Sequence, residues 1–185
     1  MEVNLAILRG INVSGQKKIQ MAGLKELFEE AGFKKVVTYI QSGNVVFENH
    51  HVLLPELPKF IEQKIKERYN FDVPVITRTV AEMGNLINQN PLLEDESLDQ
   101  DKLHVTFLAE LPAPEYLVKI EPTLYNPDKF RIQGKEVFLF CPNGYGNTKL
   151  NNTFLERKLK VTATTRNWRT VNELFRIMKA YEPAG

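Results

Sequence analysis

Cysteine is nearly missing from this 185-residue chain, which contains only Cys141. A single cysteine excludes an internal disulfide framework and favours a reducing compartment, where such bonds do not persist. The first residues have the pattern of a strand and lack the basic stretch and apolar run of a signal peptide. We therefore expect a cytoplasmic protein.

An excess of charge of either sign is missing too, since 24 lysines and arginines face 23 aspartates and glutamates. Binding to duplex nucleic acid depends on neutralising phosphates with basic side chains, so we expect no dedicated duplex-binding function. No apolar run is long enough to span a membrane, so we expect no membrane insertion. The net charge of +1 permits self-association, but the sequence defines no oligomeric state.

The short motifs that mark common catalytic sites are also missing. The chain has no G-x-S-x-G elbow, no H-E-x-x-H zinc motif, no G-x-G-x-x-G dinucleotide motif and no clustered carboxylate pair. His50 and His51 have no further ligand at a metal-binding spacing, so we expect no metal site, and the sequence identifies no cofactor. These absences predict that the protein uses neither a standard nucleophilic nor a metal-dependent mechanism.

What the sequence does contain is an internal repeat. A strand-like segment ending in Thr-Arg precedes a helix-like segment twice, the second time after an insert of three residues, as Val73–Arg78 with Thr79–Met83 and Val161–Arg166 with Thr170–Leu174. Upstream of each pair, an Ile-Gln dipeptide at Ile40 and at Ile132 leads into a glycine turn and a Val/Phe strand. Two matches in the same order indicate a duplicated α+β unit.

Hydrophobic periodicity predicts the same succession of elements in each half. The first half gives a strand at 3–8, a helix near 21–31, strands at 36–41 and 44–48, a helix near 55–69, a strand at 71–77 and a helix at 79–88. The second half gives a strand at 102–109, a helix near 113–120, strands at 128–133 and 136–140, a helix at 148–159, a strand at 161–165 and a helix at 170–180. Each half is therefore β-α-β-β-α-β followed by an extra helix.

The first six elements of each half match the split β-α-β of ferredoxin-like folds. We therefore predict an α+β fold made by tandem duplication of a ferredoxin-like unit, with mainly antiparallel sheets. The acidic, apolar-poor segment after Asn90-Pro91 has the composition of a linker. The predicted division is a first unit at 1–90, a linker at 91–101 and a second unit at 102–185.

Helix capping offers a simpler explanation for part of the repeat. Thr79-x-x-Glu82 and Thr170-x-x-Glu173 both have the form of a capping box, in which the two side chains satisfy free N–H groups reciprocally. Convergence on a good helix start can produce such a match without duplication. The Thr-Arg pair that precedes each box is harder to explain in that way.

Arg78 and Arg166 both come just before a predicted helix, where the helix dipole disfavours a cation by about 0.3–1 kcal/mol. Finding this arrangement twice indicates an acidic partner for each arginine. That partner is either an internal carboxylate that closes each unit or a bound anion.

The first candidate site combines two loops of the first half. In a ferredoxin-like unit the first and third strands are neighbours, so the loop after the first strand lies beside the turn that joins the second and third strands. Glycines allow a close backbone approach there, and basic side chains and a helix N-terminus favour an anion. The residues predicted to bind are Arg9, Asn12, Ser42, Gly43 and Asn44, with Lys17 and Lys18 adding charge. The alternative is two ordinary polar loops.

The second candidate site lies at the opposite edge of the second sheet. The loop Pro142–Lys149 opens a predicted helix with Asn147 or Thr148 as its N-cap, but it lacks the spacing of a phosphate-binding Walker loop. The end of the last strand reaches the same edge. The residues predicted to bind there are Tyr145, Lys149, Arg166, Asn167 and Trp168. Trp168 suits either stacking on a ring or ordinary packing.

These two clusters favour a protein that binds a small anionic ligand, for example a phosphate-bearing metabolite or a nucleotide. A second possibility is a protein-interaction module that uses sheet faces or helix stripes. A third is a thiol enzyme, because Cys141 ends a strand that is expected to neighbour the strand containing His104. No third residue that would orient such a pair is evident. The hairpin strands lack the paired aromatics of an RNA-recognition motif.

The chain also resembles a bacterial family catalogued as a domain of unknown function. The resemblance runs nearly end to end and is carried by these segments: Leu8–Val13, Tyr39–Phe47, Thr148–Leu150, Phe154–Glu156 and Ala163–Trp168. Members of the family often have a serine in the place of Thr148, which keeps a hydroxyl there. The resemblance implies a compact α+β protein of two similar parts, and it implies no established activity, cofactor or catalytic residue.

Overall fold

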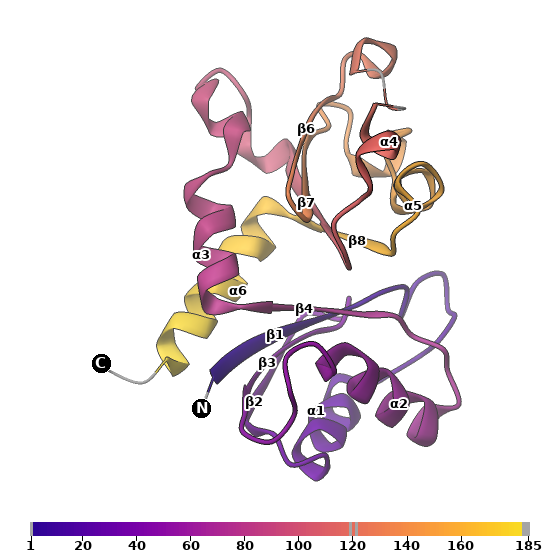
Figure 1. The fold of residues 1–185 in the computed structure, drawn as a ribbon, viewed down its shortest axis with the longest axis vertical. Helices are drawn as coiled ribbons and strands as arrows, with labels where there is room; N and C mark the ends of the chain where they lie inside the picture. The colour runs from indigo at the N-terminus through magenta and orange to yellow at the C-terminus, as the bar shows by residue number, and fades with distance from the viewer. Residues whose placement is uncertain (1, 119, 121, 183–185) are drawn as a thin grey trace. The chain divides into compact units, whose positions relative to one another are not determined.

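The computed structural model describes residues 2–118, 120 and 122–182. It contains two four-stranded sheets, each entirely antiparallel (Figure 1). The chain divides into two compact units. Unit 1 holds the residues up to Gly84 and those from Glu173 onward, and unit 2 is Asn85–Asn172.

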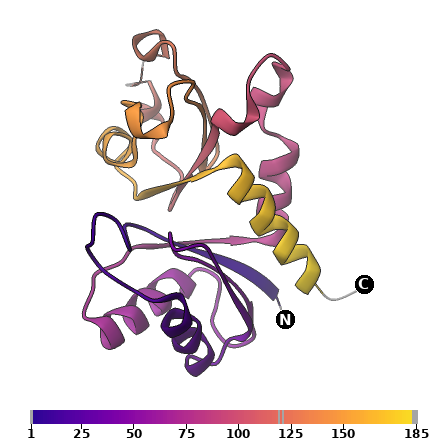
Figure 2. The same ribbon diagram turned by 180° about the vertical axis from the view of Figure 1, so that it is seen from behind.

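Unit 1 follows the predicted order of elements. In sequence these are β1 (Glu2–Leu8), α1 (Met21–Glu30), β2 (Lys34–Tyr39), β3 (Asn44–Asn49), α2 (Leu57–Tyr69) and β4 (Val75–Thr79). The sheet order is β2-β3-β1-β4, so the first strand lies between the third and the fourth. The helices α1 and α2 lie together on one face of this sheet, as both Figure 1 and Figure 2 show.

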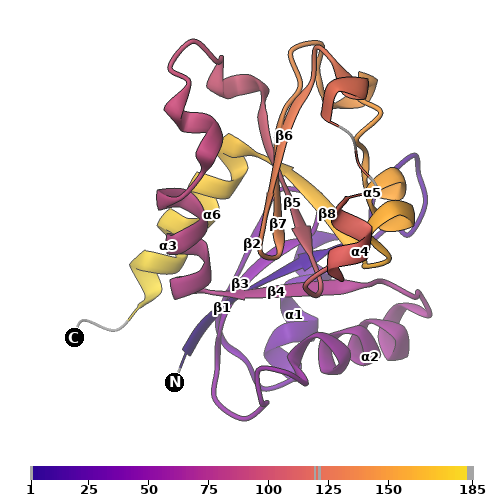
Figure 3. The same ribbon diagram turned by 45° about the horizontal axis from the view of Figure 1, so that its top comes forward.

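Unit 2 repeats this arrangement. Its elements are β5 (Leu103–Leu108), α4 (Pro114–Leu117), β6 (Lys129–Gln133), β7 (Glu136–Phe140), α5 (Asn152–Leu159) and β8 (Ala163–Asn167). The sheet order is β6-β7-β5-β8, which is the order of unit 1 strand for strand. The short α4 lies beside α5 next to β8 (Figure 3). The identical topologies confirm the predicted tandem duplication of a ferredoxin-like α+β unit.

A helix follows each sheet, as predicted. These are α3 (Val80–Asn88) after β4 and α6 (Trp168–Tyr181) after β8. The predicted linker instead contains two short 3-10 helices, η1 (Pro91–Glu94) and η2 (Gln100–Lys102). Two more 3-10 turns, η3 (Pro122–Tyr125) and η4 (Tyr145–Asn147), lie in loops of unit 2. No helix among the described residues has the length and apolarity needed to cross a membrane.

The strand registers show how the repeat aligns. Leu5 lies opposite Arg78 in the first sheet, and Val105 lies opposite Arg166 in the second. Each arginine is the fourth residue of its strand and is followed by one residue before the helix begins. The two arginines therefore occupy equivalent positions, which is the result that duplication predicts.

The N-terminal caps of α3 and α6 differ from the predicted pair of capping boxes. Thr79 forms the predicted capping box, since its N–H donates to Glu82 Oε2 at 2.9 Å and its Oγ1 accepts from the Glu82 N–H at 3.2 Å. The predicted box at Thr170 is wrong, because Asn167 Oδ1 accepts from the Thr170 N–H at 2.7 Å and α6 already begins at Trp168. Asn167 thus stands where Thr79 stands in unit 1. The apparent insert is the cap and first turn of α6.

The division at the C-terminus differs from the predicted one, because the segment from Glu173 onward belongs to unit 1. Within that unit, a Cβ added at Gly84 would lie 3.5 Å from the Phe175 ring, so the two helix segments pack closely. Leu174 and Met178 on the same segment are fully buried. The helix α6 begins in unit 2 and continues into unit 1. The predicted boundaries lie between elements, so they could not divide a single helix in this way.

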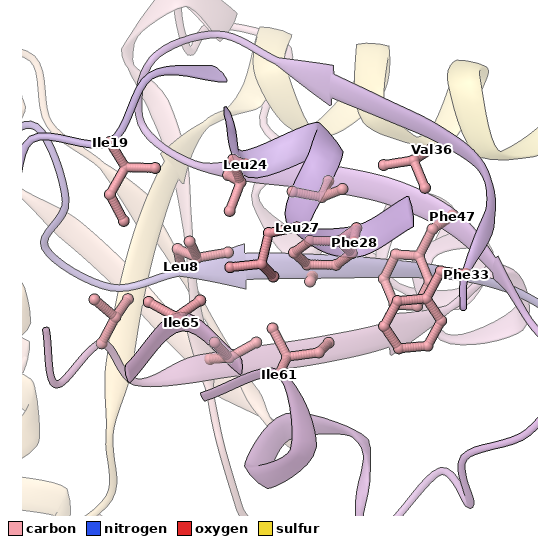
Figure 4. Packing of buried hydrophobic residues seen from close by; sticks show 14 of the residues in the cluster. Leu8, Ile19, Leu24, Leu27, Phe28, Phe33, Val36, Phe47, Ile61 and Ile65 are labelled. Carbon is pink, nitrogen blue, oxygen red and sulfur yellow. The ribbon is translucent and has the colours of Figure 1, made fainter. Parts of the chain in front are cut away.

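The core of unit 1 lies between its sheet and the pair α1 and α2 (Figure 4). Phe28 and Phe33 of the first helix and its C-terminal turn pack on Phe47 of β3, with ring centroids 5.2 Å and 4.5 Å apart. Ile61 and Ile65 of α2 close the other side of the cluster. Full burial of an aliphatic or aromatic side chain contributes about 1.5–3 kcal/mol, so this cluster holds both helices on the sheet.

The two central strands of the first sheet are buried almost throughout. All six residues of β3 are buried, and so are all residues of β1 after Glu2. A protein-interaction module that uses open sheet faces would need an exposed central face. In unit 1, no such face is present on these two central strands.

Candidate functional site

The two loops of the first predicted site lie side by side. The Leu8 N–H donates to the Gly43 carbonyl at 2.9 Å, and Asn12 Nδ2 donates to the Gln41 carbonyl at 2.8 Å. Asn12 also fastens its own loop, since Nδ2 donates to the Ile19 carbonyl and Oδ1 accepts from the Ile19 N–H, both at 2.9 Å. The strand topology therefore brings the predicted residues together, and Asn12 holds the two loops in place.

The loop Arg9–Ile19 has an unusual backbone. Among the described residues, seven non-glycine residues have a positive φ, and three of them occur in this loop, namely Asn12, Ser14 and Lys17. Each such residue costs about 1 kcal/mol or more, and strained positions cluster at functional sites. The conformation is held by the Asn12 hydrogen bonds and by Lys17 Nζ, which donates to the Asp72 carbonyl. The loop is thus pre-formed and basic.

The turn residues of this site have structural partners. Asn44 is fully buried, and its Nδ2 donates to the Tyr39 carbonyl at 2.9 Å and to Ser42 Oγ at 3.1 Å. Gly43 has φ +81°, and a Cβ at this position would lie 2.6 Å from Ile11 Cδ1. Glycine is required there because of both the left-handed backbone and the close approach. Arg9, the first residue of the loop, is half-buried.

In the second predicted site, Tyr145 lies next to the end of β8. Its ring stacks on His104 with centroids 5.1 Å apart, and its hydroxyl donates to Thr165 Oγ1 at 2.9 Å. Asn167 is the register partner of His104. Burial lowers the pKa of the His104 imidazole, which favours the neutral form of the ring. The structure therefore brings Tyr145 and Asn167 to one face of the second sheet, as the topology predicts.

Arg166 and Trp168 are placed differently from the other residues of that site. Side chains alternate along a strand, so Arg166 lies on the sheet face opposite to Thr165 and Asn167. Its guanidinium donates to the Thr164 hydroxyl and to the Thr165 carbonyl, both at 2.9 Å, and the residue is only 8% exposed. Trp168 is 6% exposed, which is the burial that ordinary packing of its ring requires.

Lys149, the remaining residue of the second site, lines a pocket within unit 2. The pocket has a volume of about 140 Å³ and combines one lysine, one aspartate, carboxamides and an aromatic ring: Lys149, Asp128, Asn126, Asn143, Asn147 and Tyr125. Lys149 is exposed and forms no ion pair with any residue that the structure describes. Convergent polar groups in a concave site fix the orientation of a small ligand, and this pocket has several of them.

Two turns build this pocket. The first ends where the Asp128 N–H donates to the Tyr125 carbonyl at 2.8 Å, and the second is η4, where the Asn147 N–H donates to the Gly144 carbonyl at 3.1 Å. Thr148 joins them, because its hydroxyl donates to Asp128 Oδ2 at 2.6 Å. The two turns are therefore held at a fixed separation.

The base of the pocket rests on the core of unit 2. The Tyr125 ring packs edge-on against Phe130 and Phe154, with centroids 6.2 Å and 5.4 Å apart. Thr148 Oγ1 accepts from the N–H of Leu150, a fully buried residue, at 3.0 Å. These contacts tie the polar lining to buried apolar residues, so the pocket is pre-formed.

Cys141 is fully buried in the same core. Burial raises the pKa of its thiol to about 11, and the negative charge of Asp128 adds to this rise. The thiolate is the reactive form, and at neutral pH almost none is present at such a pKa. His104 Nδ1 is directed at the Lys102 carbonyl, 3.1 Å away. These contacts argue against the thiol-enzyme alternative.

Sequence reasoning missed most of the pocket. It selected Lys149 and the loop that contains Asn143 and Asn147, but it named neither asparagine as a binding residue. Asp128 lies twenty positions from Thr148 in sequence and meets it only in the folded unit. The Asn-Pro-Asp triplet that ends at Asp128 was the available signal, because such residues mark tight turns that expose polar groups.

The fold and these sites define a duplicated ferredoxin-like α+β protein with polar loops at its sheet edges. A family described as protein of unknown function DUF1697 matches residues 1–138, and the chain belongs to this family. The chain is also similar to a solved structure, the conserved bacterial protein SP0830 from Streptococcus pneumoniae. The identity is 20% and the TM-score 0.75, over 96% of this chain and 98% of that chain. Comparison with curated proteins gives no match.

Proposed function

We propose that the protein binds a small ligand through an anionic group in the pocket of unit 2, with Lys149 as the cation that receives it. The observation that carries this proposal is that Lys149 lines a pre-formed polar pocket and forms no ion pair with any described residue. A lysine beside carboxamide groups offers both a charge and hydrogen-bond donors to a carboxylate or a phosphate.

The size of the pocket limits the ligand. Sites for drug-sized molecules occupy about 300–1,000 Å³, whereas this pocket occupies about 140 Å³. It suits a molecule of a few heavy atoms, or the charged end of a larger one. A whole nucleotide would extend well beyond the pocket.

The loop Arg9–Ile19 stays a second predicted anion site, with Arg9 and Lys18 as its cations. Its pre-formed and strained backbone supports the prediction. Within the loop and its neighbouring turn, however, the side chains of Asn12 and Asn44 donate to backbone groups. Less hydrogen-bonding capacity is therefore offered to a ligand there than in the pocket of unit 2.

A thermal-unfolding screen tests the proposal. The probes are inorganic phosphate, sugar phosphates, small monocarboxylates and amino acids, each compared with sodium chloride at the same ionic strength. A ligand at one hundred times its Kd stabilises a protein by about 2.7 kcal/mol. For a chain of this size that corresponds to a rise in melting temperature of about 5–10 °C.

Matched variants locate the binding site. Lys149→Gln removes the pocket cation and is expected to abolish the rise. Lys34→Gln removes an exposed lysine of β2 that belongs to neither predicted site, and it is expected to leave the rise intact. The proposal is refuted if no anionic probe stabilises the protein, or if Lys149→Gln responds as the unmodified chain does.

A further inference from the structure

The pocket of unit 2 carries a second charged group besides Lys149. Asp128 lines the same cavity of about 140 Å³, is half-buried, and has the opposite charge. Neither side chain forms an ion pair with the other or with any other residue that the structure describes. Two opposite charges that face one small cavity without pairing leave room for a ligand between them.

The orientation of Asp128 is fixed. Its Oδ2 accepts a hydrogen bond of 2.6 Å from the Thr148 hydroxyl, while Oδ1 accepts none from the described residues. The second oxygen is therefore the one that a ligand can reach. Because a carboxylate accepts hydrogen bonds and donates none, its natural partner is a donor, and best a cationic one.

A simple anion suits this pair of charges poorly. A phosphate dianion held by Lys149 would be repelled by the Asp128 carboxylate, since both lie on a cavity only a few atoms wide. A monocarboxylate would be repelled less but would leave Asp128 without a partner. A molecule that carries one carboxylate and one ammonium group would satisfy both residues at once.

The rest of the lining fits the same kind of molecule. Asn147 Nδ2 donates to the Asn143 carbonyl at 2.8 Å, which fixes the amide and leaves its Oδ1 as an acceptor for a further donor. Leu124, Tyr125 and Pro127 supply apolar surface on the other turn. A short aliphatic or hydroxylated side chain would find room against that surface.

We propose that the ligand of this pocket is a small α-amino acid, with its carboxylate at Lys149 and its ammonium group at Asp128. The inference rests on the proposed function, because it uses the same pocket and the same lysine. It adds the second charge, and with it a chemical class: zwitterions in preference to phosphates and simple carboxylates.

Three matched probes test the inference on the unmodified full-length chain by calorimetric titration. Alanine carries both charges, propanoate lacks the ammonium group, and alaninamide lacks the carboxylate. A charge-assisted hydrogen bond corresponds to about tenfold in affinity. Alanine is therefore expected to bind about tenfold more tightly than either of the other two.

A substitution then assigns the ammonium site. Asp128→Asn keeps an oxygen that accepts from Thr148 but removes the charge, and it should reduce the affinity for alanine to about that for propanoate. Asp101→Asn, an exposed aspartate of η2 in the same unit, should change neither affinity.

The outcomes separate the two proposals. If propanoate binds as tightly as alanine, or if Asp128→Asn keeps the preference for alanine, the amino-acid inference is wrong while anion binding stands. If alaninamide binds as tightly as alanine, or if none of the three binds, the amino-acid inference is wrong, and the anionic probes of the thermal screen then decide whether the proposed function stands. The probe series on the unmodified chain decides this even if the Asp128 variant fails to fold.

Discussion

The hydroxyl of Thr148 is predicted to make the main contribution to holding the two turns of the pocket together. Replacing Thr148 with valine keeps the shape of the side chain and removes only the hydroxyl, at a position that is 7% exposed. The change deletes a 2.6 Å hydrogen bond to Asp128 and leaves the buried Leu150 N–H without its 3.0 Å acceptor. An unsatisfied buried group costs about 1–3 kcal/mol, and a lost bond to a charged group costs about 1.5–3 kcal/mol.

Because Asp128 is half-exposed, water replaces part of the lost bond, and we expect Thr148→Val to lower the free energy of unfolding by about 2 kcal/mol. The melting temperature should fall by about 4–8 °C. Urea denaturation followed by the fluorescence of Trp168, the single tryptophan, gives this free energy, because the residue is buried in unit 2.

Thr148→Ser is the matched control, since it keeps the hydroxyl and loses one methyl group, at a cost of about 1 kcal/mol. Serine is also the residue that the family resemblance places there. The reasoning is refuted if the valine variant is as stable as the serine variant, because then neither hydrogen bond contributes to stability.

Three further predictions follow from single sites. Gly43→Ala should lower the free energy of unfolding by about 3 kcal/mol in urea denaturation, because the new Cβ would lie 2.6 Å from Ile11 Cδ1. Gly15→Ala is the control: position 15 also has a positive φ, of +77°, but no atom lies within 4 Å of the new Cβ, so the cost should be only about 1 kcal/mol. Equal costs for the two variants would contradict the account. Asn167→Ala should cost about 1 kcal/mol through loss of the α6 cap, and no change in stability would show that another residue caps the helix. Cys141 should resist alkylation at pH 7 in the native chain and react fully in urea, whereas rapid native modification would restore the thiol-enzyme alternative.

The Cys141 thiol also predicts a pH dependence of stability. Its pKa is about 11 in the folded chain, against about 8.5 for an unfolded cysteine. The raised value means that folding favours the neutral thiol. Its stabilising contribution is therefore complete below about pH 8.5 and is lost as the pH rises through about 11. In urea denaturation at rising pH, Cys141→Ala should show a weaker loss of stability than the unmodified chain, and identical curves would contradict this assignment.

The fold was largely predictable because its signals are local. Alternating apolar residues, a helical stripe such as Leu24, Leu27 and Phe28, and glycine at the Gly43 turn each depend only on near neighbours in sequence. The errors occurred where two local signals competed. Thr170 and Asn167 are both good caps, and the hydrogen bond from the Thr170 N–H to Asn167 Oδ1 shows that Asn167 is the one used.

The predicted start of α5 is also wrong, but for a different reason. The helix was predicted from 148, with Asn147 or Thr148 as cap, and it begins at Asn152 with the Asn151 side chain accepting from the Phe154 N–H at 3.0 Å. Thr148 is unavailable as a cap because Asp128 and the Leu150 N–H take its hydroxyl. The tertiary contact with Asp128 thus outweighed the local preference.

The candidate site was predictable only in part, because a site depends on contacts between distant segments. Strand topology was enough to place the loop of Asn12 beside the turn at Gly43, and the loop of Tyr145 beside the last strand, as the bonds to Gln41 and Thr165 show. It gave no indication that the turn at Asp128 would meet the loop before α5. Side chains alternate along β8, so Arg166 and Asn167 lie on opposite faces of the sheet. Which of the two faces carries Tyr145 depends on how the segments pack, and the sequence alone does not show this.

The central claim is that the pocket around Lys149 receives the ligand. Titration of isotope-labelled protein with alanine, followed in the amide proton–nitrogen correlation spectrum, tests it most directly. The account predicts that the shifted signals come from the two turns at 124–128 and 143–149, including the side-chain amides of Asn143 and Asn147. Saturating alanine that leaves these signals in place, or shifts centred on the Arg9–Ile19 loop instead, would contradict it.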